Sequence, residues 1–271
     1  MVFPNIPYLL EKFPNTTFRA TIDQSTVAHT FENFVFANYM GFRSIYMMPN
    51  GRDKWAEENK TILKSELEKI FQFMANYFIS GQERISFLPM NDSFNRVLTH
   101  DILSVTGAES KIAEPRSPVR CGMGTGFGSI GYDGRIYGCQ EQNSKDLKNI
   151  FFIGDIFNGI DIEKHKILLE EYTKPVILKS ENEALCESCK LRNICSTFAC
   201  PSSSWDLFGS FFIDNEIHCL WNQWLFENAI VLMYYFNGEE NDNNKWFKKY
   251  LLKECNYDKA FPNEEKRGEC G

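Results

Sequence analysis

The stretch CESCKLRNICSTFAC, residues 186–200, holds four of the nine cysteines in the 271-residue chain. The cysteine spacing continues in both directions, so that the whole pattern is C-x12-G-x4-C, a gap, C-x2-C-x5-C-x4-C, a second gap, and C. The seven cysteines of this pattern are Cys121, Cys139, Cys186, Cys189, Cys195, Cys200 and Cys219. Such a density of thiols favours metal ligation, and the spacing has to decide which metal is bound.

The rest of the sequence places these thiols in a reducing compartment. The first residues, MVFPNIPYLLEKFPNTTF, have no basic segment ahead of an apolar run, so they do not read as a secretory signal. The most apolar later run, 220–236, contains Asn222, Gln223, Glu227 and Asn228, which favours a buried helix over a membrane span. We therefore expect a cytoplasmic protein without a membrane partner, in which thiols stay reduced and available to metals.

Size and charge narrow the class of protein further. Hydrophobic residues make up 43% of the chain, which is enough for one large core or two modest ones. The formal net charge is −7. Because nucleic-acid phosphates select for a basic protein surface, this charge argues against a nucleic-acid partner.

Zinc and iron–sulfur clusters both use cysteine ligands, but they need different arrangements. A structural zinc ion takes four ligands, commonly from two C-x2-C pairs. Cys186 and Cys189 form one such pair, no second pair exists, and one zinc ion would leave three of the seven thiols unused. Two [4Fe–4S] clusters would use nearly all seven and accept distant ligands. The spacing therefore favours iron–sulfur clusters, with a zinc-stabilised module as the alternative.

Upstream of the cysteines, predicted strands and helices alternate. Strands are expected at 17–22 (TFRATI), 43–49 (RSIYMMP) and 84–90 (RISFLPM), and helices at 27–41 and 62–79, each helix ending at a glycine. The second helix has an apolar stripe. The stripe consists of Leu63, Leu67, Ile70, Phe71, Met74 and Phe78. The alternation of strand and helix predicts βα units with a parallel sheet.

The cysteine-bearing half has a different pattern. Residues 121–140 contain alternating glycines, but they do not match G-x-G-x-x-G and no helix follows, which excludes a dinucleotide-binding loop. Asp133-Gly134 predicts the turn of a small β-hairpin. The surrounding glycines would let the backbone approach a bulky inorganic group closely. Further helices are expected at 162–172, 220–236 and 245–253.

The full cysteine pattern resembles the seven-cysteine signature of SPASM domains. These are auxiliary-cluster modules at the C-terminus of many radical S-adenosylmethionine (radical SAM) enzymes, typically enzymes that modify peptides or proteins. Upstream, TFRATID, SIYMMP, a Trp55-x-x-Glu58 segment and a long amphipathic helix resemble the later βα units of the radical SAM partial barrel. The resemblance covers roughly residues 15–220. One departure is the spacing between Cys195 and Cys200, where four residues stand instead of the usual three.

This resemblance implies an α/β fold with two parts and an extension. Residues 1–105 would form the last few βα units of a partial TIM-type barrel, residues 106–222 a small cysteine-rich α+β SPASM domain, and residues 223–271 a C-terminal helical extension. The implied cofactors are two [4Fe–4S] clusters. S-adenosylmethionine and a third [4Fe–4S] cluster would belong only to a completed enzyme.

The resemblance also implies which cysteines share a cluster. One cluster would be held by Cys186, Cys189, Cys195 and Cys219, and the other by Cys121, Cys139 and Cys200. The last iron of the second cluster would take Glu114, water or a substrate group. His218, beside Cys219, is a candidate ligand, although a position next to the ligands is the favoured interpretation. Arg19, at a strand end, would face S-adenosylmethionine or substrate, with a surface salt bridge as the alternative.

Two cysteines lie outside the pattern. We expect Cys255 to be structural and Cys270, beside the terminal glycine, to be an exposed thiol.

One motif of the radical SAM enzymes is missing from the sequence. No C-x3-C-x2-C occurs, and no cysteine precedes Cys121, so the ligands of the cluster that binds S-adenosylmethionine are lacking. We therefore expect the sequence to begin mid-barrel, because the gene is truncated or split, because the start is internal, or because the protein is a naturally cut-down form. A separate N-terminal barrel fragment is then a candidate partner. The resemblance then implies part of an enzyme that modifies a peptide or protein substrate, such as a small precursor peptide. The alternatives are a free-standing iron–sulfur protein for electron transfer or peptide binding, and the zinc-stabilised module.

Overall fold

The structure is a computed structural model that describes residues 3–81, 85–99, 122–143, 148–173, 179–180, 189, 191, 200–237 and 242–255. The chain divides into two compact units. Unit 1 comprises Met1–Ala108 and Leu220–Gly271, and unit 2 comprises Glu109–Cys219.

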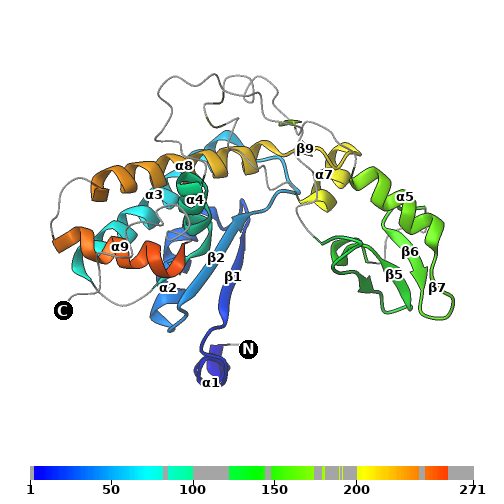
Figure 1. The fold of residues 1–271 in the computed structure, drawn as a ribbon, viewed down its shortest axis with the longest axis horizontal. Helices are drawn as coiled ribbons and strands as arrows, with labels where there is room; N and C mark the ends of the chain where they lie inside the picture. Colours follow the sequence, from blue (N-terminus) through cyan, green and yellow to red (C-terminus); the bar gives the residue numbers. More distant parts are fainter. Residues whose placement is uncertain are drawn as a thin grey trace. The chain divides into compact units, whose positions relative to one another are not determined.

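Unit 1 contains a three-stranded parallel sheet. Its strands are β1 (Thr17–Ile22), β2 (Ser44–Pro49) and β3 (Ser86–Phe87), in the order β1-β2-β3. β1 and β2 pair along their whole length, from Thr17 opposite Ser44 to Ile22 opposite Pro49, and lie side by side in Figure 1. Burial alternates along β2, which is the period expected of a strand with one covered face. The predicted parallel sheet is confirmed for these strands.

The helices of unit 1 follow the predicted order. They are η1 (Phe3–Asn5), α1 (Ile6–Lys12), η2 (Val27–His29), α2 (Thr30–Tyr39), α3 (Glu57–Ser80), α4 (Leu88–Thr99) and α9 (Asp242–Glu254). Helix α8 (Glu216–Asn237) begins at the end of unit 2 and continues into unit 1. The helices expected at 220–236 and 245–253 are therefore confirmed as α8 and α9, each starting three or four residues earlier than predicted.

Helix α3 supplies much of the core of unit 1. All six residues of its predicted apolar stripe are buried. Gly81 ends the helix in the left-handed conformation (φ 65°), as the sequence predicts. Near this end, the ring of Phe78 makes edge-to-face contacts with Phe236 of α8 and with Phe247 and Tyr250 of α9. These contacts join the C-terminal helices to the βα part of the same unit.

The strand predicted at 84–90 is largely wrong. The described strand is only two residues long, and α4 begins at Leu88. Pro89 explains the difference, because proline in the first helical turn lacks only an N–H that the helix does not use. Asn91 of α4 then donates to Ser86 Oγ (2.8 Å) and accepts a short hydrogen bond from Tyr250. These buried bonds hold α4 against β3 and α9.

Unit 2 is built on an antiparallel sheet. Its strands are β4 (Ser129–Ile130), β5 (Arg135–Tyr137), β6 (Phe152–Asp155) and β7 (Gly159–Ile160), in that order. The predicted hairpin is confirmed: Gly134 has a φ of 80°, and Asp133 accepts a hydrogen bond from Arg135 N–H (3.2 Å). The other elements are η4 (Gln140–Gln142), α5 (Ile162–Tyr172), α7 (Pro201–Phe208), and the parallel pair β8 (Lys179–Ser180) and β9 (Ile213–Asp214). Helix α5 has the predicted bounds.

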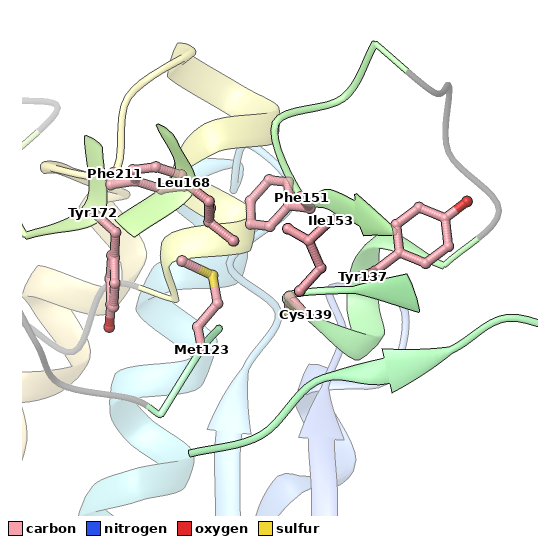
Figure 2. Packing of buried hydrophobic residues seen from close by; sticks show 8 residues of the cluster. All are labelled: Met123, Tyr137, Cys139, Phe151, Ile153, Leu168, Tyr172 and Phe211. Atoms are coloured by element: carbon pink, nitrogen blue, oxygen red, sulfur yellow. The ribbon is translucent and has the colours of Figure 1, made fainter. Parts of the chain in front are cut away.

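A single hydrophobic cluster fills the described core of unit 2 (Figure 2). It consists of Met123, Tyr137, Cys139, Phe151, Ile153, Leu168, Tyr172 and Phe211. These residues come from the hairpin sheet, from α5 and from the segment after α7. One of the predicted metal ligands is therefore part of this core.

Among the described helices, none combines the length and the apolar character that crossing a membrane requires.

Candidate iron–sulfur site

Four of the seven predicted ligands lie in the described part of the chain. Cys139 and Cys219 are buried, whereas Cys189 and Cys200 are partly exposed. Cys121, Cys186 and Cys195 fall outside the described residues, as do Glu114 and Cys270. Each predicted cluster thus has two described ligands. Within the described ranges, no three His, Cys, Asp or Glu side chains gather as metal ligands.

Cys139 lies where the hairpin ends. It follows β5, its backbone is still extended (φ −140°, ψ 135°), and it is the residue before η4. Its side chain is 7% exposed and belongs to the core cluster in Figure 2. Its carbonyl oxygen accepts a hydrogen bond from Gln142 N–H (3.1 Å), which closes the single turn of η4. The thiol position is therefore set by a β-hairpin on one side and a short helix on the other.

A buried glutamine links this turn to the segment that contains Cys200. Gln142 is fully buried, and its side-chain amide donates to Ser202 Oγ (2.7 Å) and to Asp206 Oδ1 (3.1 Å). Its side-chain oxygen Oε1 accepts a hydrogen bond from Asn149 Nδ2 (3.0 Å). Gln142 is three residues from Cys139, and Ser202 is two residues from Cys200. The hydrogen bonds of one side chain therefore join two segments that are about sixty residues apart in sequence.

Cys200 is the N-cap residue of α7. Pro201 occupies the first position of the helix, and Ser204 N–H donates to the Cys200 carbonyl oxygen (2.9 Å). Proline at this position suits the start of a helix because its fixed φ matches the helical value. The backbone of Cys200 is therefore fixed by the helix, and the residue is partly exposed.

Cys219 lies in the first turn of α8. Asn215 caps this helix: its side-chain oxygen accepts from Ile217 N–H (3.0 Å), and its carbonyl oxygen accepts from His218 N–H (3.1 Å). Cys219 is 6% exposed and His218 is 3% exposed. A buried imidazole next to a predicted ligand fits the expected position of His218 beside the ligands, and its role remains a prediction.

One buried polar atom one turn further along α8 has no partner. The amide nitrogen of Asn222 is inaccessible to solvent and forms no hydrogen bond. Asn222 is three residues after Cys219, so the two side chains lie on the same side of the helix, with Cβ atoms about 5–6 Å apart. A cluster held by Cys219 would bring acceptor sulfur atoms to this region. The buried thiols and the unpartnered amide therefore fit an iron–sulfur group.

Two of the glycines in residues 121–140, Gly124 and Gly138, have a packing role that the sequence did not indicate. A Cβ on Gly138 would lie only 2.4 Å from Leu168 Cδ2, and one on Gly124 would lie 3.3 Å from the same atom. His165 of α5 also forms a hydrogen bond with the Gly124 carbonyl oxygen (2.5 Å). These two glycines let α5 pack directly on the hairpin. The space that a side chain would need there is filled by protein, not left for an inorganic group.

The sequence predicts Arg19 at a strand end, but it is the third of the six residues of β1 in unit 1, where it is exposed. Its guanidinium group is 5.0 Å from the centre of the Tyr46 ring, and Tyr46 is its direct neighbour on β2. On the same face, Thr17 donates to Ser44 Oγ (3.2 Å). The guanidinium therefore has a defined cation–π partner on the sheet. Its contact with S-adenosylmethionine or substrate remains a prediction.

Cys255, outside the cysteine pattern, follows α9 in unit 1 and is buried. Its thiol is 3.9 Å from the Asn91 carbonyl oxygen. Burial, with a smaller effect from Glu254, raises the pKa of this thiol to about 12. The thiol therefore stays protonated near neutral pH, which agrees with the structural role expected from the sequence.

No family model and no curated protein matches the chain. Several solved structures match it. Histidine-tagged anSMEcpe with bound AdoMet is 17% identical, with a TM-score of 0.55 and coverage of 90% of this chain and 61% of that one. Native anSMEcpe with bound AdoMet is 16% identical, with a TM-score of 0.54 and coverage of 88% and 62%. Native anSMEcpe with bound AdoMet and Cp18Cys peptide is 16% identical, with a TM-score of 0.52 and coverage of 88% and 64%.

The protein in these structures is an anaerobic sulfatase-maturating radical SAM enzyme. Identities this low establish a common fold and nothing finer. The chain spans about three fifths of the length of the structures that it matches. Over that length, this mixed α/β chain shares the fold of a radical SAM enzyme.

Proposed function

We propose that the chain is the auxiliary-cluster part of a radical SAM enzyme that modifies a peptide or protein. In this proposal residues 1–105 are the last βα units of a partial barrel, residues 106–222 are a SPASM domain, and residues 223–271 are a helical extension. The seven-cysteine pattern supports the two clusters, and the shared fold supports the enzyme class. Reducing conditions in the cytoplasm would keep the thiols available to iron.

The link through Gln142 is the observation that supports a cluster shared by Cys139 and Cys200. Cys139 and Cys200 are expected to share a cluster, although they are far apart in sequence. The Gln142 amide bonds to Ser202 and Asp206 hold the segments after these two cysteines together. The bond to Ser202 joins two buried residues and is therefore protected from competition with water, whereas Asp206 is exposed. The protein therefore supplies a fixed connection between two ligand-bearing segments.

Three of the four described ligands are also fixed by an element of their own. Cys139 is held between β5 and η4, Cys200 caps α7, and Cys219 lies in the capped first turn of α8. Ligands on defined elements need little rearrangement to bind a rigid inorganic group. In a completed enzyme, auxiliary clusters held there would accept an electron or bind substrate, while S-adenosylmethionine and its own cluster would supply radical chemistry.

A peptide or protein substrate is the favoured substrate class. Two of the matched structures hold peptides together with AdoMet, named Cp18Cys and Kp18Cys. We extend this substrate class to the present chain as a proposal. The sequence contains no C-x3-C-x2-C, so in the proposed enzyme the ligands for the S-adenosylmethionine cluster would not be cysteines of this pattern from these 271 residues.

Anaerobic iron and sulfide analysis tests the proposal. The reconstituted chain should bind about eight irons with matching sulfide and absorb broadly near about 400 nm. Cys139→Ala and Cys200→Ala should each lose about four irons, and the double variant should lose no more than either single variant. Combining Cys139→Ala with Cys219→Ala should remove nearly all the iron, because these cysteines are assigned to different clusters.

One control variant and two contrary outcomes make this test decisive. Cys255→Ala should keep all the iron, because this buried thiol is assigned to neither cluster. A colourless protein with about one zinc would favour the zinc-stabilised module instead. Additive iron loss in the Cys139→Ala, Cys200→Ala double variant would contradict the shared cluster.

A further inference from the structure

The amide of Asn222 is the unexplained polar group in the described part of α8. Its nitrogen is buried and forms no hydrogen bond. Its neighbours one turn further along the helix, Leu225 and Phe226, are buried and apolar. Leaving a buried N–H donor without an acceptor costs about 1–3 kcal/mol, so a native helix rarely keeps one without a reason.

A second asparagine in the same helix, Asn228, forms a local hydrogen bond that Asn222 lacks. Asn228 donates from its side-chain nitrogen to the carbonyl oxygen of Trp224 (2.8 Å), four residues earlier. This local bond is the usual solution for a short polar side chain within a helix. Asn222 has the same residue type and the same helical backbone, yet its amide does not form the corresponding bond. The Asn222 nitrogen is therefore left without the local acceptor that Asn228 uses.

The position of Asn222 indicates an acceptor of another kind. It lies one helical turn after Cys219, the α8 residue with a thiol expected to bind iron, and both residues belong to one uninterrupted helix. Cysteine sulfur and the inorganic sulfide of a cluster both accept N–H hydrogen bonds, and such bonds help to set the reduction potential. We infer that the Asn222 amide donates a hydrogen bond to a sulfur of the cluster that Cys219 holds.

This inference rests on the proposed function, because it needs an iron–sulfur cluster on Cys219. It makes Asn222 a positioning and tuning residue rather than a ligand. An N–H donor at sulfur stabilises the reduced cluster more than the oxidised one, since reduction adds negative charge. Removing the donor should therefore lower the reduction potential without removing a ligand.

The test uses the full chain with one cluster left. In the Cys139→Ala, Cys200→Ala background, only the cluster assigned to Cys219 should remain. An EPR-monitored redox titration then compares Asn222→Leu, which removes the donor at similar volume, with Asn228→Leu as the matched control. We expect Asn222→Leu to lower the reduced-to-oxidised ratio at a fixed potential about tenfold, which is about 59 mV for a one-electron couple. Asn228→Leu should leave it unchanged.

The stability of the iron-free protein separates this role from simple packing. Without a cluster, Asn222→Leu should leave thermal stability unchanged or raise it, because it removes an unpaired buried donor. Asn222→Gln keeps the amide and should keep iron. Equal potentials in Asn222→Leu and its parent, or loss of iron in both Asn222 variants, would overturn the inference. Absence of iron in the parent would instead overturn the proposed function.

Discussion

Replacing Gln142 with leucine is the sharpest test of how unit 2 is held together. The substitution removes two hydrogen bonds between neutral groups, to Ser202 and from Asn149, and one to the Asp206 carboxylate. Each neutral bond contributes about 1 kcal/mol and the bond to a carboxylate about 2 kcal/mol. Burial of the apolar leucine side chain in place of glutamine stabilises the folded unit by about 1–2 kcal/mol, which offsets part of this loss. We therefore expect Gln142→Leu to lower the free energy of unfolding of unit 2 by about 2–3 kcal/mol.

Hydrogen exchange is the suitable assay, because it reports on unit 2 separately from unit 1. The amides of Ser204 and Gly209, which donate within α7 and at its end, should exchange faster in Gln142→Leu. Gln140→Leu is the matched control, since Gln140 is in the same short helix but exposed. The iron assigned to Cys139 and Cys200 should also be released more easily. Unchanged protection of α7 in Gln142→Leu would refute the argument that this side chain joins the two segments.

Three further predictions concern other parts of the chain. Because the pKa of the Cys255 thiol is raised from 9.0 to about 12, alkylation at pH 9 should be about 500-fold slower in the folded than in the unfolded chain, as measured by mass spectrometry. The contribution of this thiol to the free energy of unfolding should be lost as the pH rises from 9 toward 12. Gly138→Ala should lower the free energy of unfolding of unit 2 by about 1–3 kcal/mol. In a double-mutant cycle, Leu168→Ala should lower that free energy less in the Gly138→Ala background than in the wild-type chain. Arg19→Met should lower the free energy of unfolding, measured in urea, by no more than about 1 kcal/mol, because only the cation–π contact with Tyr46 is lost. A large loss of S-adenosylmethionine affinity in a completed enzyme would therefore indicate direct contact.

Local patterns in the sequence were sufficient to predict a helix or a turn where one residue type or one hydrophobic period dominates. The apolar stripe of α3 placed the helix and its buried side, and Asp133-Gly134 placed the hairpin turn. The run RISFLPM misled because a short apolar segment before a proline fits both a buried strand and a strand that passes into a helix. The contacts of Asn91 with Ser86 and Tyr250 settle the helical start, and Tyr250 is far away in sequence.

The side chains most informative about the site gave no signal in the sequence. Gln142 is an ordinary polar residue until Ser202 and Asp206 surround it, and a single sequence does not reveal that contact. Asn222 served in the sequence only as an argument against a membrane span. Its importance comes from a missing hydrogen bond, which only coordinates can reveal. The cysteine pattern, by contrast, is complete in the sequence, and three of its members lie outside the described residues.

Because Leu168 fills the space above Gly138, these two positions should change together over evolution. A relative with alanine at the position of Gly138 needs a smaller residue at the position of Leu168, or a helix α5 that lies further from the hairpin. Such paired changes would trace the contact between helix and hairpin independently of the cysteines. They would therefore identify relatives that keep this architecture even where the metal ligands have been lost.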